Sequence, residues 1–136
     1  MEQGFVKVAS ATPRIRVADP VYNAQVICEQ AKEAAEHGAK IVVFPELCIT
    51  GYTCNDLFLQ ELLLEKAKEA LLTIAEETGQ LETLFLVGLP VDKDGRLYNV
   101  AAVLYRGRIL GMIPKKNIPM YAEFYEGRHF LSLIHI

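Results

Sequence analysis

Short apolar runs alternate along the chain with longer segments in which apolar residues recur every three or four positions. Phe5 to Ala11 alternates apolar with small or polar residues, which predicts a strand. Ile41 to Phe44 is a continuous apolar run, the pattern of a strand covered on both faces. Leu84 to Leu89 is a second such run and also predicts a strand.

Two further strands are predicted near the end of the chain. Asn99 to Leu104 and Arg108 to Ile113 flank Arg106-Gly107, a pair suited to a tight hairpin turn. Asp92 to Gly95 predicts another turn before this hairpin.

The segments with helical periodicity have recognisable ends. Asp19 and Pro20 suit the N-cap and first position of a helix that we expect to end near His37, before Gly38. A longer helix is predicted from Asp56 to Thr78, before Gly79. Its apolar stripe consists of Leu63, Ala67, Ala70, Leu71, Ile74 and Ala75.

The predicted order is therefore strand, helix, strand, helix and three strands, which indicates an α/β sheet with helices on at least one face. No internal repeat or linker divides the 136 residues, so we expect one small domain with its own core. The hydrophobic fraction of 51% is typical of globular proteins rather than disordered ones.

Charge and cysteine content restrict the possible partners and location. A net charge of −3 with scattered basic residues argues against a nucleic-acid partner. The N-terminus lacks an export signal, and no apolar run reaches membrane-spanning length, so we expect no membrane partner and a cytoplasmic location. Cys28, Cys48 and Cys54 lack metal-site spacing and are expected to be reduced, buried thiols.

Glu46 and Lys115 are the candidate chemical groups. Each follows an apolar run that ends in a proline, Phe44-Pro45 for Glu46 and Ile113-Pro114 for Lys115. Charged groups at the ends of buried strands need a partner or a function, and residues beyond the carboxyl ends of such strands line functional crevices. We therefore expect the carboxylate and the ammonium to lie within about 4 Å of each other.

These residues lie in two motifs that resemble those of the nitrilase superfamily of carbon–nitrogen hydrolases. Phe44-Pro45-Glu46-Leu47 with Gly51-Tyr52 resembles the glutamate motif, and Pro114-Lys115 with Ile118-Pro119 the lysine motif. Gly51 to Phe58 and Tyr121 to Arg128 resemble one branch, the N-terminal glutaminase domain of glutamine-dependent NAD synthetases. The resemblance extends from about Val6 to Phe130. It implies a nitrilase-like α-β-β-α sandwich, of which this chain would be an incomplete N-terminal part.

The resemblance also implies Glu-Lys-Cys chemistry. A cysteine would attack the side-chain amide of glutamine, Glu46 would be the general base, and Lys115 would stabilise the oxyanion. Glu126 would orient the lysine, while Tyr121 and Tyr52 would form walls of the glutamine pocket.

At the level of the parent protein, the resemblance implies further partners. Ammonia would pass to a synthetase domain that uses ATP and Mg to amidate nicotinic acid adenine dinucleotide to NAD. No metal or cofactor is implied for the present chain, and the parent would be a homo-oligomer.

The nucleophile is expected to lie outside this chain, because in the family it follows the lysine by some tens of residues. Cys28 falls within the first predicted helix, Cys54 in a loop, and Cys48 is expected to point away from Glu46. We accordingly expect residues 1–130 to be a partial hydrolase domain that is inactive alone. Leu131 to Ile136 departs from the family pattern, and one back-translation resembles a sequencing-adaptor sequence, so we interpret it as a non-native read-through tail. A native apolar strand containing His135 is the alternative.

Other interpretations remain open. The chain could belong to an amidase or carbamoylase that acts on a free small amide, or be a non-catalytic α/β interaction module in which Glu46 and Lys115 form a structural ion pair. Tyr121 could be a packing residue. A one-residue shift would exchange Lys115 with Lys116.

Overall fold

A computed structural model describes residues 4–116, which form one five-stranded sheet and two α-helices. In chain order the elements are β1 (Val8–Ser10), α1 (Pro20–Glu36), β2 (Ile41–Val43), the 3₁₀ helix η1 (Asn55–Leu59), α2 (Glu61–Glu77), β3 (Leu84–Lys93), β4 (Arg96–Tyr105) and β5 (Arg108–Pro114). This order confirms the predicted succession of strands and helices.

The strands are arranged in chain order, β1-β2-β3-β4-β5. The β1–β2 and β2–β3 pairs are parallel, whereas β3–β4 and β4–β5 are antiparallel. Two reversals of direction make β5 run the same way as β2. The carboxyl ends of β2 and β5 therefore point to the same edge of the sheet.

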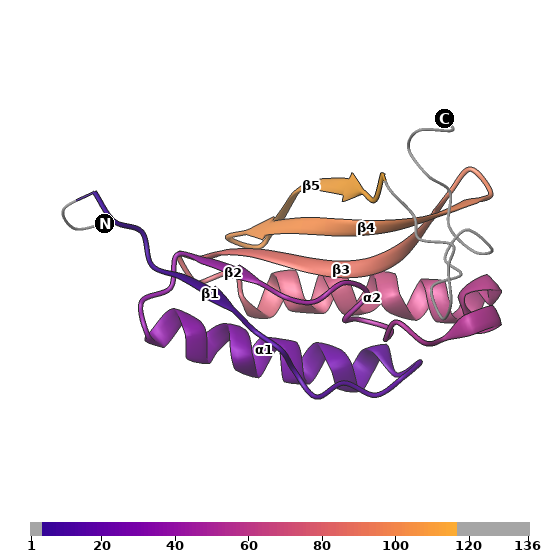
Figure 1. Cartoon of the computed structure of the whole chain (residues 1–136), viewed down its shortest axis with the longest axis horizontal. Helices are drawn as coiled ribbons and strands as arrows, with labels where there is room; N and C mark the ends of the chain where they lie inside the picture. Colours follow the sequence, from indigo (N-terminus) through magenta and orange to yellow (C-terminus); the bar gives the residue numbers. More distant parts are fainter. Residues whose placement is uncertain (1–3, 117–136) are drawn as a thin grey trace.

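Both helices lie on one face of the sheet, as Figure 1 shows. The core fills the space between the helices and the sheet. Its largest fully buried members include Ile27, Val42, Leu71, Ile74, Phe85, Val87, Leu89 and Leu104. Alternate residues of the strands point to the opposite face. There Val43 is 45% exposed, so the expectation that its strand is covered on both faces is wrong for the described part of the chain.

The first helix follows its predicted signals. Asp19 is the N-cap, its side chain accepts a hydrogen bond from the backbone N–H of Tyr22, and Pro20 is the first helical residue. The second helix differs from its prediction because Gln60, with φ −83° and ψ 122°, is extended and separates η1 from α2. Packing explains the break: Phe58 of η1 is buried in a small cluster with Leu47, Cys54 and Leu63.

The hairpins differ from prediction mainly in strand length. The turn between β3 and β4 is confined to Asp94 and Gly95, which have φ of 54° and 73°. Arg106 and Gly107, with φ of 51° and 81°, form the predicted turn between β4 and β5. Two-residue turns of this kind match the twist of the flanking strands, which lets pairing continue up to the turn. Among the helices of residues 4–116, none is long and apolar enough to cross a bilayer.

Candidate active site

Glu46 lies on a short excursion of the chain out of the sheet. The backbone N–H of Phe44 donates to Leu86 O at 2.9 Å, and that of Ile49 donates to Gly88 O at 3.2 Å. The two acceptors are two residues apart on β3, but the two donors are five apart. A regular parallel ladder advances equally on both strands, so three extra residues loop out. The loop carries Glu46 away from the plane of the sheet.

The loop lies directly against Gly88 of β3. A Cβ at Gly88 would meet the backbone of the loop, including Pro45 O at 2.8 Å and the still closer backbone nitrogen of Leu47. Only glycine allows this approach. Leu47 has φ 53°, a left-handed conformation that costs a non-glycine residue about 1–3 kcal/mol. Its side chain is fully buried, and this burial offsets the cost.

A buried asparagine of α1 holds the chain that follows the loop. The side-chain amide of Asn23 donates to Ile49 O and to Arg16 O, both at 2.8 Å, and its Oδ1 accepts from Arg16 N at 2.7 Å. Asn23 is 0% exposed. It therefore ties the segment before α1 to the segment after Glu46.

Lys115 approaches Glu46 from the end of β5, along the same edge of the sheet. Lys115 follows the end of β5, and two strands separate β5 from β2, so the strand axes are about 14 Å apart. Nevertheless Lys115 Nζ lies 2.6 Å from Glu46 Oε1. The side chains are 28% and 41% exposed, respectively. The prediction that this pair meets within about 4 Å is confirmed.

Asn99 of β4, which was not predicted as a site residue from the sequence, connects the two residues. Its side-chain nitrogen donates to Glu46 Oε1 at 2.5 Å, and its backbone oxygen accepts from Lys115 N at 2.7 Å. Asn99 is 4% exposed. The available signal was an asparagine that opens an otherwise apolar strand run, since asparagine is depleted in strands.

The three residues line an open cavity of about 370 Å³, within the range of small-molecule sites. The other described lining residues contribute apolar side chains or backbone atoms. They are residues 43–45 and 86–88, Val100, Ala101, Ile113 and Pro114. Glu46 and Lys115 are the charged members of this lining. The cavity can thus hold a small substrate against one carboxylate and one ammonium group.

The remaining predicted site residues are not all brought to this cavity. Tyr52 is half-buried against the cluster of Leu47, Cys54, Phe58 and Leu63 and is not part of the described lining. Its role in substrate binding stays a prediction. Tyr121 and Glu126, together with 131–136, lie outside the described residues. Lys116 is exposed next to Lys115, whose side chain makes the contact with Glu46.

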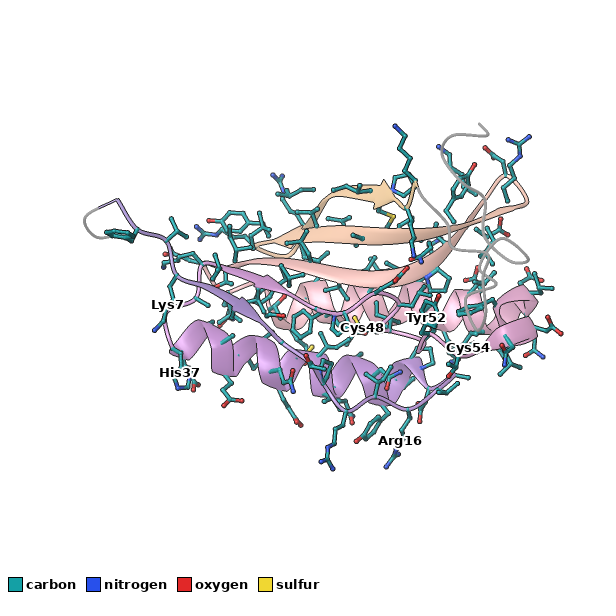
Figure 2. The ribbon with its side chains drawn as sticks, viewed as in Figure 1. Lys7, Arg16, His37, Cys48, Tyr52 and Cys54 are labelled. Carbon is teal, nitrogen blue, oxygen red and sulfur yellow. The ribbon has the colours of Figure 1, made fainter. Side chains whose placement is uncertain are left out.

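None of the three cysteines lines the cavity, and all three are buried. Figure 2 shows Cys48 between the sheet and the helices. Burial raises the pKa of Cys48 to about 12 and, together with the neighbouring Glu77, that of Cys28 to about 12. Burial also raises the pKa of Cys54. A nucleophilic cysteine needs a lowered pKa, so these thiols are unsuited to that role.

Cys48 points away from Glu46, but not for the expected reason. The expectation treated the segment as extended, whereas residues 46–50 form a turn. The Cys48 thiol donates to Gly88 O at 3.7 Å on the core side. Within residues 4–116, no group of three or more histidine, cysteine or acidic side chains could hold a metal ion.

The α/β fold of the described residues carries an acid–lysine pair at the carboxyl ends of its strands. The model of the carbon–nitrogen hydrolase family matches residues 7–132, and the chain belongs to this family. Its resemblance to that family, first seen in the Glu46 and Lys115 motifs, is confirmed.

Among curated proteins, the chain is similar to glutamine-dependent NAD(+) synthetases. It is 40% identical over 127 residues to that of Mycobacterium tuberculosis (strain H37Rv), covering 93% of this chain and 19% of the relative. It is 34% identical over 130 residues to that of Acinetobacter baylyi, covering 96% of this chain and 23% of the relative. The chain thus spans about a fifth of the length of the relatives that it matches.

Solved structures agree with the fold class. A glutamine-dependent NAD(+) synthetase from Cytophaga hutchinsonii superimposes with a TM-score of 0.88 at 30% identity, over 93% of this chain and 22% of that chain. An amidase from Nesterenkonia sp. gives a TM-score of 0.76 at 23% identity, over 93% of this chain and 48% of that one. The nitrilase-like α/β fold is therefore shared well beyond close relatives.

Proposed function

We propose that this chain is the N-terminal part of the glutamine amidohydrolase domain of a glutamine-dependent NAD synthetase. The 2.6 Å contact between Lys115 Nζ and Glu46 Oε1 carries the proposal, because it places a proton acceptor beside a cation in a cavity of substrate size. The name shared by the similar synthetases supports glutamine as the substrate.

In this proposal the nucleophile is a cysteine outside the 136 residues. Its thiol gives a proton to Glu46 as sulfur attacks the amide carbon of glutamine, and Lys115 stabilises the resulting oxyanion. Glu46 then passes the proton to the leaving group, which departs as ammonia. Finally Glu46 takes a proton from the water that attacks the thioester, the C–S bond breaks to release glutamate, and the proton returns from Glu46 to the cysteine sulfur.

The rest of the parent protein completes the proposed activity. ATP and Mg would bind in a synthetase portion, where the ammonia amidates nicotinic acid adenine dinucleotide in a cytoplasmic homo-oligomer. Residues 1–130 would be the hydrolase part and 131–136 a non-native tail. Tyr52 and Tyr121 as pocket walls, and Glu126 as the group that orients Lys115, belong to the same proposal.

A chimera tests the proposal directly. Residues 7–130 of this chain would replace the matching segment of the Mycobacterium tuberculosis synthetase, and ammonia release from glutamine would be measured. We expect turnover in the chimera. The Glu46→Gln and Lys115→Met variants should each lose about 10²- to 10⁴-fold in rate, the usual contribution of such groups. Lys116→Met is the matched control and should retain activity.

Two results would count against this function. One is a chimera that folds, as judged by circular dichroism, but releases no ammonia. The other is a chimera in which Glu46→Gln and Lys116→Met have equal effects. Faster hydrolysis of acetamide than of glutamine by the chimera would favour the amidase interpretation instead.

A further inference from the structure

We propose that Asn99 is a positioning residue that holds the Glu46 carboxylate in the orientation required of a general base, an inference that rests on the proposed function. Its side-chain nitrogen donates to Glu46 Oε1 at 2.5 Å. An ionised carboxylate only accepts hydrogen bonds, so the amide nitrogen, rather than the amide oxygen, must face it. The bond is therefore directional and specific to a donor at this position.

The geometry separates the two oxygens of Glu46. Asn99 Nδ2 and Lys115 Nζ both donate to Oε1, and Oε2 receives neither of these bonds. Two donors on one oxygen fix the rotation of the carboxylate and leave the other oxygen for proton transfer. This constraint matters because the Glu46 side chain is 41% exposed and lies on a turn, where a long side chain otherwise samples several rotamers.

Asn99 holds Lys115 by a different group. Its backbone oxygen accepts the Lys115 N–H at 2.7 Å, a bond that any residue at this position would retain. The contact with Glu46, in contrast, depends on the asparagine side chain. Replacing that side chain should therefore disturb the base and leave the placement of the lysine backbone intact.

The burial of Asn99 also indicates a purpose beyond filling space. Asn99 is 4% exposed and belongs to β4, where its sequence neighbour Val100 and the alternate residues Ala102 and Leu104 supply core packing. Burying an amide in such a strand is costly unless it is hydrogen-bonded. Glu46 accepts that bond, 53 residues away in the chain.

The first arm of the test uses the 136-residue chain and does not depend on catalysis. In ¹⁵N-labelled protein, the side-chain amide signals of Asn99 are assigned by their loss in Asn99→Ala. We expect these signals to shift in Glu46→Gln, which removes the charge of the acceptor. Glu82→Gln is the matched control, because Glu82 pairs with Arg106 on the exposed surface. If the chemical shifts of the Asn99 side-chain amide do not change in Glu46→Gln, the proposal is overturned.

The second arm measures glutamine hydrolysis in the chimera. Asn99→Ala should lower kcat by about 10- to 100-fold, because a misplaced catalytic group loses orientation rather than substrate binding. KM should change by less than about threefold. Thr83→Val is the matched control: it removes another buried side-chain bond, that from Thr83 Oγ1 to Ala39 O at 2.8 Å, far along the sheet from Glu46. It should leave kcat unchanged.

Asn99→Asp keeps the size of the side chain and removes the donor when the new carboxyl group is ionised. When ionised, the new carboxyl group repels Glu46; when protonated, it can donate as the amide does. Glu46 and Lys115 are the charged groups in the described lining, so their charges would influence the pKa of the introduced carboxyl group. The kcat of Asn99→Asp relative to the unsubstituted chimera should therefore rise as the pH falls. A ratio that does not vary with pH would count against a direct contact between position 99 and Glu46.

The outcomes separate the two proposals. An inactive but folded chimera contradicts the proposed function, and the amide signals then decide the placement of Glu46 by Asn99. An active chimera in which Asn99→Ala retains kcat, or changes KM alone, overturns only the role of Asn99. Equal losses in Asn99→Ala and Thr83→Val would also overturn it, because they would show a general effect of destabilisation.

Discussion

Gly88 faces the backbone of Leu47 so closely that no side-chain carbon fits between them. The contact joins the middle of β3 to the loop that carries Glu46, and it lets the base of the loop approach the sheet closely. Asn99 approaches from β4 and Lys115 from the end of β5. The height of this loop above the sheet therefore decides whether Glu46 can contact them.

Gly88→Ala should lift the loop and destabilise the protein. The added carbon would also meet Pro45 O at 2.8 Å, and overpacking of this kind costs about 1–3 kcal/mol. Urea unfolding would measure the loss. Gly111→Ala is the matched control, because a Cβ at that position of β5 meets nothing within 4 Å, and it should change stability by less than about 0.5 kcal/mol. Equal effects would show that the close approach is unimportant.

Replacing Asn23 by leucine should cost about 2–4 kcal/mol in the free energy of unfolding. The change leaves Ile49 O, Arg16 O and Arg16 N without their buried partner, and each such loss costs about 1–3 kcal/mol before relaxation. The exposed Gln25→Ala on the same helix should have little effect. A small loss in Asn23→Leu would mean that water replaces the missing bonds.

Stability should fall in alkaline solution because of Cys48. Burial raises the pKa of this thiol from 9.0 to about 12, so the unfolded chain loses its proton first. The contribution is constant below about pH 9, and the free energy of unfolding should decrease between pH 9 and about 12. Urea unfolding of the unsubstituted chain and of Cys48→Ala would isolate this slope. A difference between them that does not vary with pH would contradict the prediction.

The 136-residue chain alone should release no ammonia from glutamine. In the proposed mechanism, Glu46 and Lys115 give little rate acceleration without the nucleophile, since residues of one catalytic unit act together. Ammonia would be assayed on material that circular dichroism shows to fold cooperatively, beside the active chimera. Turnover that disappears when Cys48 or Cys54 is replaced would show that the nucleophile lies within this chain.

The sequence by itself was sufficient for local features. Asp19-Pro20 predicts the start of α1 and Arg106-Gly107 the last hairpin, because capping and turn geometry depend on adjacent residues. Glu46 and Lys115 were recognisable for a similar reason, since each belongs to a short motif. The two residues meet because β2 and β5 run in the same direction. The order of elements is consistent with this direction but does not determine it.

Only the tertiary structure decided how the site is held. Asn99, Gly88 and Asn23 act through contacts with residues 53, about 40 and 26 positions away, and local sequence does not show which distant groups they meet. The same is true of the break at Gln60, where the burial of Phe58 prevails over helical periodicity. Long-range packing and hydrogen bonding select among conformations that local propensity leaves nearly equal, because propensity differences are usually below about 1 kcal/mol per residue.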